Sequence, residues 1–245
     1  MKSLLDILQS KEDKQINLIC FPFAGGGARA YYNWKRISKL ASIYAISLPG
    51  RESKINEEPY RKMEILIDDL TEEISPLLNK KCIFFGHSMG AKIAFETAKK
   101  LEKMGSVQPY HLIVSGSRAP HIQELNPIYN LPDEEFIKAL YRFEGTPKEI
   151  LENKDLIRFF LPVLRADFTM DEIYYSKNNY PLKCPITALG GSKDREASLP
   201  EVEQWNEYTK NRFKMKIFKG GHFFIREQEE HVLEEIIRII EQHKV

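Results

Sequence analysis

One serine in this chain lies in a sequence pattern that could perform acyl transfer. Ser88 occupies the centre of Gly86-His87-Ser88-Met89-Gly90, between an apolar run of strand type and an amphipathic helical pattern. This spacing is typical of a nucleophile elbow, a sharp strand-to-helix turn that exposes the serine hydroxyl. Both glycines are needed because a β-carbon would clash where strand and helix approach. The pattern predicts a nucleophile at Ser88, and an incidental serine in a glycine-rich turn is the alternative.

A serine hydroxyl needs a base that accepts its proton, and one of the six histidines has a suitable place in the sequence. His222 follows the last predicted strand, in a loop where Gly220 and Gly221 let the chain turn back over the sheet. His87 is next to Ser88 but is expected to point elsewhere. We therefore predict His222 as the general base. The other histidines are expected to begin a strand, to begin a helical insertion or to lie in the last helix: His111, His121, His231 and His243.

The imidazole in turn needs a carboxylate that orients it. Asp194 is the first carboxylate after the strand predicted at residues 185–190, whereas the preceding strand is followed by Ser115-Gly116-Ser117-Arg118. The chain order of nucleophile, acid and base is then the one expected of an α/β-hydrolase. We predict Asp194 as the acid, with Glu196 as the second choice and a turn-forming role for Asp194 as the alternative.

The tetrahedral intermediate of acyl transfer needs two N–H donors for its oxyanion. One is expected from the backbone of Met89, and the other from the loop Phe23-Ala24-Gly25-Gly26 after the first predicted strand. This loop has neither the G-x-G-x-x-G spacing nor the lysine of a phosphate-binding loop. It is therefore predicted to bind an oxyanion.

The elements that must position these residues alternate between strands and helices. Residues 1–14 are predicted as a frayed or helical lead-in. Alternating strands and helices predict a mostly parallel central sheet flanked by helices, in a single α/β domain over residues 1–245. Apolar runs predict strands at 16–21, 43–48, 82–85, 111–115, 185–190 and 214–218, and helical spacing predicts helices at 31–40, 63–78, 91–101 and 229–243.

Residues at about 120–180 interrupt this alternation. Short helices are predicted near Pro132, at the capping-box sequence Thr146-Pro147-Lys148-Glu149 and at residues 155–164. A helical insertion between two strands of a parallel sheet predicts a lid over the carboxyl ends of the strands. Helices packed elsewhere are the alternative.

Composition and charge exclude several classes of protein. The 245 residues are 42% hydrophobic, and 36 basic against 35 acidic residues give a net charge of +1. This balance favours neither nucleic acid nor an anionic membrane as a partner. The first residues are not expected to form a signal peptide, and no apolar run has the length of a membrane span. Cys20, Cys82 and Cys184 are predicted to be buried reduced thiols of a cytoplasmic protein, with no metal site or redox pair.

Five motifs together resemble those of a type II thioesterase, a stand-alone α/β-hydrolase that accompanies nonribosomal peptide and polyketide synthases. The resemblance spans about residues 14–243. One difference is that Arg195-Glu196 follows Asp194 where many hydrolases have proline. The motifs are Phe21-Pro22-Phe23-Ala24-Gly25-Gly26, Leu48-Pro49-Gly50-Arg51, Gly86-His87-Ser88-Met89-Gly90-Ala91, Leu164-Arg165-Ala166-Asp167-Phe168 and Gly220-Gly221-His222-Phe223-Phe224.

The resemblance implies a function and a set of site residues. The activity would be hydrolysis of acyl or aminoacyl thioesters on the phosphopantetheine arm of carrier proteins, which clears misprimed synthases. Ser88, Asp194 and His222 would form a catalytic triad, and the N–H groups of Met89 and Ala24 would form the oxyanion hole. The enzyme would be a cytoplasmic monomer without a cofactor of its own, and its partners would be acyl or peptidyl carrier domains.

Two other functions fit the same residues. A carboxylesterase or lipase acting on free esters would use the same triad. An α/β-hydrolase fold without turnover could serve as a binding module, although the complete triad argues against this. Arg29, Arg51 and Arg118 are weak candidates for local docking of a carrier, with a solvated surface role favoured for each.

Overall fold

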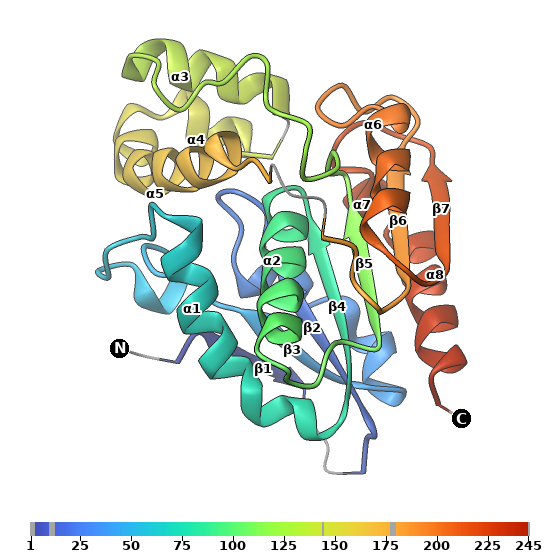
Figure 1. Ribbon diagram of the computed structural model, residues 1–245. Helices are drawn as coiled ribbons and strands as arrows, with labels where there is room; N and C mark the ends of the chain where they lie inside the picture. Colours follow the sequence, from blue (N-terminus) through green and yellow to red (C-terminus); the bar gives the residue numbers. More distant parts are fainter. Residues whose placement is uncertain (1–2, 10–12, 144, 177–179, 245) are drawn as a thin grey trace.

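The computed structural model describes residues 3–9, 13–143, 145–176 and 180–244, whose arrangement is shown in Figure 1. These residues contain seven strands in one sheet, in the order β1-β3-β2-β4-β5-β6-β7. β1 pairs antiparallel with β3, and all other pairs are parallel, so the predicted mostly parallel sheet is confirmed. The strands are Leu5–Gln9 (β1), Ile16–Phe21 (β2), Ser42–Ile46 (β3), Lys81–His87 (β4), His111–Ser115 (β5), Ile186–Gly191 (β6) and Phe213–Phe218 (β7).

Helices cover both faces of the sheet (Figure 1). Along β2, Ile19 and Phe21 belong to the buried cluster that includes residues of α1, α2, α6 and η6, whereas Leu18 and Cys20 belong to the cluster that includes residues of η1, η2, α7 and α8. Because both faces are buried, residues 18–21 of β2 form a continuous apolar run. The covering helices are Met63–Ile74 (α1), Met89–Lys103 (α2), Leu199–Glu203 (α6), Gln204–Tyr208 (η6), Ala28–Tyr31 (η1), Trp34–Lys39 (η2), Phe224–Glu227 (α7) and Glu229–Gln242 (α8).

The prediction for the first residues was wrong, because residues 5–9 form the edge strand β1. Leu5 pairs with Ile46 of β3, and Leu4 is buried while Ile7 is exposed. Apolar residues in such a short segment do not distinguish helix from strand, and here pairing with β3 decides the conformation.

The helix predicted at residues 31–40 is also different in the structure. Two 3₁₀ helices, η1 and η2, occupy this region. Tyr31, Trp34 and Ile37 are all buried on the same side. Their spacing of three residues places them on one face of a 3₁₀ turn, so the burial pattern fits the tighter helix.

The helical insertion lies between β5 and β6, beyond the carboxyl ends of the strands at the upper left of Figure 1. It contains α3 (Asp133–Leu140), η5 (Tyr141–Phe143), α4 (Lys148–Glu152) and α5 (Lys154–Ile173). These helices bury a cluster of their own, which includes Phe136, Leu140 and Phe168. α5 is longer than predicted because its second half packs against the body of the protein, where Met170 joins the main core.

The N-termini of two helices in the insertion differ from the prediction. The predicted capping box at Thr146 does not form, since Pro147 is the N-cap of α4 and makes no side-chain cap bond. α5 has the stronger cap, because the side chain of Asn153 accepts from the N–H groups of Asp155 and Leu156 at 3.0 and 3.1 Å. Such a bond satisfies donors that lack an acceptor within the helix.

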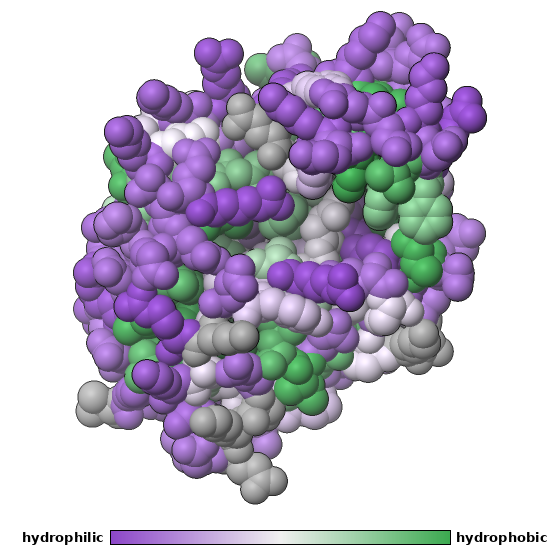
Figure 2. All heavy atoms as spheres, turned by 180° about the vertical axis from the view of Figure 1, so that it is seen from behind, coloured by the Kyte–Doolittle hydropathy of each residue, from purple (hydrophilic) through white to green (hydrophobic). Residues whose placement is uncertain are grey.

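The three cysteines are buried and free of disulfides, as predicted. Burial raises the pKa of Cys82 and of Cys184 to about 12, and it raises the pKa of Cys20 well above its usual value. In the described part of the chain, no helix has the length and apolarity needed to span a bilayer. Figure 2 shows a mostly hydrophilic surface, with apolar side chains gathered at the upper right, on the side of the insertion.

Candidate active site

The turn from β4 to α2 holds Ser88 in a backbone conformation that is rare for residues other than glycine. Its φ and ψ angles are 55° and −123°. A β-carbon on Gly86 would lie 2.1 Å from the carbonyl oxygen of Gly90, and one on Gly90 would lie 2.2 Å from the carbonyl oxygen of Phe21. These approaches leave no room for any side chain. The packing of β2, β4 and α2 therefore fixes the strained turn, and strain of this kind often marks functional positions.

The structure brings together the three residues predicted to form the triad. Nε2 of His222 lies 3.1 Å from Oγ of Ser88, and Nδ1 lies 3.0 and 3.1 Å from the two carboxylate oxygens of Asp194. His222 and Asp194 are buried, whereas Ser88 is partly exposed. The geometry joins a hydroxyl, an imidazole and a carboxylate in one hydrogen-bonded chain whose open end faces solvent.

Backbone donors hold the Asp194 carboxylate in place. Its Oδ1 accepts from the N–H groups of Glu196 and Ala197 at 2.9 and 3.2 Å. Hydrogen bonds of this type stabilise an ionised carboxylate. Glu196, the second choice for the acid, forms an ion pair with Arg142 of the insertion instead. Burial raises the pKa of Glu196 above its usual value, while Arg142 acts in the opposite direction.

His87 is buried behind the elbow, and its Nδ1 lies 3.0 Å from Oγ of Ser115. Burial, with smaller effects from His222 and Arg226, lowers the pKa of His87 well below its usual value. His87 therefore stays neutral at ordinary pH. The ring centroids of His87 and His222 are 5.1 Å apart. Because His87 is neutral, it places no positive charge beside His222.

The loop after β2 forms a tight turn beside the elbow. The N–H of Gly26 donates to the carbonyl of Phe23 at 2.8 Å, and Gly25 has a φ of +74°, as the third residue of a type II turn requires. Ala24 is the second residue of this turn. Met89 is the first residue of α2, so its N–H has no acceptor within the helix. Both predicted oxyanion donors thus lie in segments that adjoin Ser88.

Two charged residues that hold this loop were not predicted from sequence. Arg51 and Asp167 form a buried ion pair, and Asp167 also accepts from the N–H of Gly25 at 2.7 Å. Both the docking role considered for Arg51 and the solvated surface role favoured for it are therefore wrong, since its side chain is only 5% exposed. The guanidinium of Arg118 also forms an ion pair, with Glu124 at 3.2 Å. Asp167, a carboxylate between the apolar residues Ala166 and Phe168, was the available signal for a buried partner.

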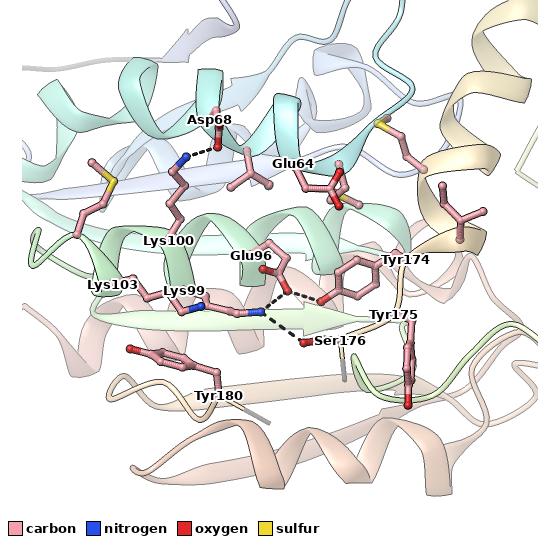
Figure 3. Close-up of a pocket in the computed structure, with 15 residues that line it drawn as sticks. Glu64, Asp68, Glu96, Lys99, Lys100, Lys103, Tyr174, Tyr175, Ser176 and Tyr180 are labelled. Atoms are coloured by element: carbon pink, nitrogen blue, oxygen red, sulfur yellow. Dashed lines mark hydrogen bonds and ion pairs between the residues drawn. The ribbon is translucent and has the colours of Figure 1, made fainter. Parts of the chain in front are cut away.

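A groove of about 850 Å³ lies away from the predicted triad, along α1, α2 and the chain that follows α5 (Figure 3). Lys99, near its middle, is about 16 Å along the axis of α2 from Ser88, at roughly 1.5 Å per residue. Lys99 pairs with Glu96 at 2.8 Å, and Lys100 pairs with Asp68. The charges shown in Figure 3 therefore largely neutralise one another.

The sheet order, the elbow and the insertion define an α/β-hydrolase fold, as predicted. The chain belongs to the thioesterase-domain family, because the family model matches residues 16–243. Its class is therefore that of the thioesterase hydrolases. Among the described residues, no group of three or more histidine, cysteine or acidic side chains is arranged to hold a metal ion.

Individual relatives agree with this assignment. The gramicidin S biosynthesis protein GrsT of Aneurinibacillus migulanus is 40% identical over 222 residues, which cover 90% of this chain and 87% of GrsT. The thioesterase PikA5 of Streptomyces venezuelae is 34% identical, over 87% of this chain and 76% of PikA5. The solved structure of YbtT, a type II thioesterase from the yersiniabactin NRPS/PKS pathway, has a TM-score of 0.86 and 32% identity, with 96% of this chain and 97% of YbtT covered. The predicted resemblance to type II thioesterases is therefore confirmed.

Proposed function

We propose that this protein hydrolyses acyl or aminoacyl thioesters on the phosphopantetheine arm of carrier proteins, and thereby clears misprimed nonribosomal peptide or polyketide synthases. The observation that carries the proposal is the hydrogen-bonded chain of Ser88, His222 and Asp194 in a member of the thioesterase-domain family. The relatives named for gramicidin S and yersiniabactin biosynthesis support carrier-bound substrates.

In the proposed mechanism, Ser88 is the nucleophile and His222 is the base. Oγ attacks the thioester carbonyl carbon while Nε2 of His222 takes the hydroxyl proton. Asp194 fixes the tautomer of the imidazole and stabilises its charged form. The N–H groups of Met89 and Ala24 stabilise the oxyanion of the tetrahedral intermediate.

Collapse of this intermediate breaks the carbon–sulfur bond. The pantetheine sulfur leaves with the proton from His222, and the acyl group stays on Ser88 as an ester. His222 then takes a proton from water, whose oxygen attacks the ester carbonyl. The second intermediate releases a carboxylic acid and restores the Ser88 hydroxyl. The net reaction consumes one water and yields a free thiol on the carrier.

We also propose that the insertion containing α3, α4 and α5 is a lid over this site. It lies beyond the carboxyl ends of the strands, and Arg142 of η5 pairs with Glu196 beside Asp194. A flexible arm would reach Ser88 beneath the lid while the carrier body docks outside. Binding would then come mainly from the carrier and its arm, so selectivity among short acyl groups would be shallow, since one methylene changes discrimination by only ~10–200-fold.

A comparison of substrates tests the thioesterase proposal. We expect the highest kcat/KM for an acetyl or aminoacyl group on an intact carrier protein, a lower value on free pantetheine and the lowest value for a simple ester with the same acyl group. A preference for the simple ester would favour a carboxylesterase. Binding of loaded carrier without any turnover, and without a covalent burst from an activated ester, would favour a binding module.

A further inference from the structure

The ion pair between Arg51 and Asp167 has a fixed geometry. Nη1 of Arg51 lies 2.6 Å from Oδ2 of Asp167, and Nη2 lies 2.8 Å from Oδ1. The side chains are only 5% and 0% exposed. Two parallel hydrogen bonds orient a guanidinium and a carboxylate more strictly than one contact can. Removing one partner alone would leave an unpaired buried charge.

This pair also binds the backbone of the loop after β2. Oδ2 of Asp167 accepts from the N–H of Gly25 at 2.7 Å, and Nη1 of Arg51 donates to the carbonyl of Gly26 at 2.8 Å. The anchored N–H belongs to the peptide group that joins Ala24, the proposed oxyanion donor, to Gly25, and the anchored carbonyl is that of Gly26, two residues after Ala24. α5, the helix that carries Asp167, also lies close to the loop, because a β-carbon added to Gly25 would lie 2.6 Å from Cδ2 of Leu164.

A loop of this kind needs external support. Gly25 has access to both positive and negative φ angles, so its turn has little intrinsic preference for one conformation. An oxyanion donor is effective only when it is already aimed at the position where charge develops. The ion pair supplies charged partners for an N–H and a carbonyl of the loop, and it thereby fixes the turn.

We propose that Arg51 and Asp167 are positioning residues for the oxyanion hole, acting through the backbone of Gly25 and Gly26 on the N–H of Ala24. This inference rests on the proposed acyl-transfer function. Neither side chain touches the substrate. Because Asp167 belongs to α5, the loop is held only while α5 lies against it, so the insertion and the oxyanion hole are coupled.

The main test is the double variant Arg51→Met with Asp167→Leu. It removes both charges together, so no unpaired ion remains buried, and replacements of this kind are often neutral for stability. We expect kcat on a loaded carrier to fall by roughly 100-fold, because a misplaced group can cost that much. KM should change little. The inhibition constant of a trifluoromethyl ketone, which forms an oxyanion on Ser88, should rise by a similar factor.

Asp167→Asn is the second variant. It leaves the buried charge of Arg51 unpaired, so we expect it to be less stable than the double variant, but the folded protein should show the same changes in kcat and in the inhibition constant. The matched control is Asp171→Asn, which removes an ion pair between α5 and Lys92 at 2.8 Å without contacting the loop. We expect this control to retain the kcat and the inhibition constant of the unchanged protein.

All measurements are made well below the melting transition of each variant. If both Asp167 variants melt earlier but keep their kcat and inhibition constant, the pair is only structural and the inference is overturned. Failure of the function itself has a different signature. If the proposed function is wrong, Ser88→Ala will retain turnover. If Ser88→Ala loses turnover but Asp167→Asn keeps its kcat and inhibition constant, only the positioning role is refuted.

Discussion

The guanidinium of Arg142 and the carboxylate of Glu196 form an ion pair, with 3.2 Å between Nε and Oε1. Arg142 belongs to η5 of the insertion, and Glu196 follows Asp194 after one intervening residue. This pair connects the insertion to the loop that carries the proposed acid. It also directs the Glu196 carboxylate to a partner other than His222.

The two carboxylates should therefore respond differently to neutralisation. Asp194→Asn should lower kcat by about 10⁴-fold, because the imidazole tautomer is no longer fixed. Glu196→Gln should cost at most about tenfold, since it removes only an ion pair that is partly exposed to solvent. Steady-state turnover of a loaded carrier measures both effects. The reverse ranking would identify Glu196 as the acid.

Ser88→Ala should fold normally and lose turnover by roughly 10⁶-fold, as expected when a serine nucleophile is removed. A serine-directed phosphonate should add mass to the unchanged protein at Ser88, which peptide mass spectrometry can locate. Ser115 is buried and hydrogen-bonded to His87, so it should remain unlabelled. Labelling at Ser115 or Ser117 with Ser88 intact would exclude Ser88 as the nucleophile.

Close backbone packing at the elbow should make Gly90→Ala severely destabilising. The added methyl group would lie 2.2 Å from a backbone oxygen of Phe21, and neither element can move without disturbing the sheet. Gly105→Ala is the matched control, because no atom lies within 4 Å of its added methyl group and the cost is only that of a positive φ. We expect about 1 kcal/mol there. Thermal unfolding of the two variants measures the loss of stability, and an equal loss in both would contradict the packing argument.

Glu172, near the end of α5, should make folding stability depend on pH. Burial raises its pKa to about 7 from 4.5, and Asp171 and Glu124 add to the shift, although the N–H groups of Ile128 and Tyr129 oppose it. Between these values the folded state keeps a proton that the unfolded chain has lost. The contribution of Glu172 to stability therefore falls as pH rises from about 4.5 to 7, and it then stays constant.

The variant Glu172→Gln isolates this effect, because a neutral amide resembles the protonated acid. Its free energy of unfolding, relative to that of the unchanged protein, should increase between about pH 5 and pH 8. Denaturant unfolding at constant ionic strength measures the difference. A difference that stays constant over this range would show that Glu172 titrates normally in the folded state.

The proposed lid should respond to a carrier domain. Leu156 and Phe159 of α5 are exposed, and the insertion has its own small core. Protection from hydrogen exchange should be lower in residues 133–173 than in β2, β4 and β5, and it should change in the insertion when a carrier binds. Equal protection in the insertion and the sheet, with or without carrier, would contradict a moving lid.

The sequence was most informative where function depends on neighbouring residues. The elbow around Ser88 combines a glycine pattern with a strand before it and a helix after it, so its geometry could be predicted from local signals. Asp194 and His222 were found because each follows a recognisable parallel strand. Parallel strands bring their carboxyl ends to one edge of the sheet, and this topology turns distant residues into neighbours.

Features that depend on distant partners could not be predicted in the same way. β1 becomes a strand only because β3 offers a free edge. Arg51 and Asp167 are 116 residues apart in the chain, and nothing near either residue indicates the other. Each belongs to one of the motifs that resemble type II thioesterases. Only the structure shows that the two motifs share an ion pair, which explains the charged residue in each.

The three buried cysteines have a consequence for the chemistry of product release. Hydrolysis of a carrier-bound thioester leaves a free pantetheine thiol beside the enzyme in every catalytic cycle. A protein cysteine forms a mixed disulfide with a small thiol only when an oxidant has first oxidised one of the two sulfurs, and only where the protein sulfur is accessible and partly ionised. Cys20, Cys82 and Cys184 are buried with raised pKa values, so none can be trapped in a mixed disulfide with the product. The protein is thus suited to repeated contact with thiols under changing redox conditions.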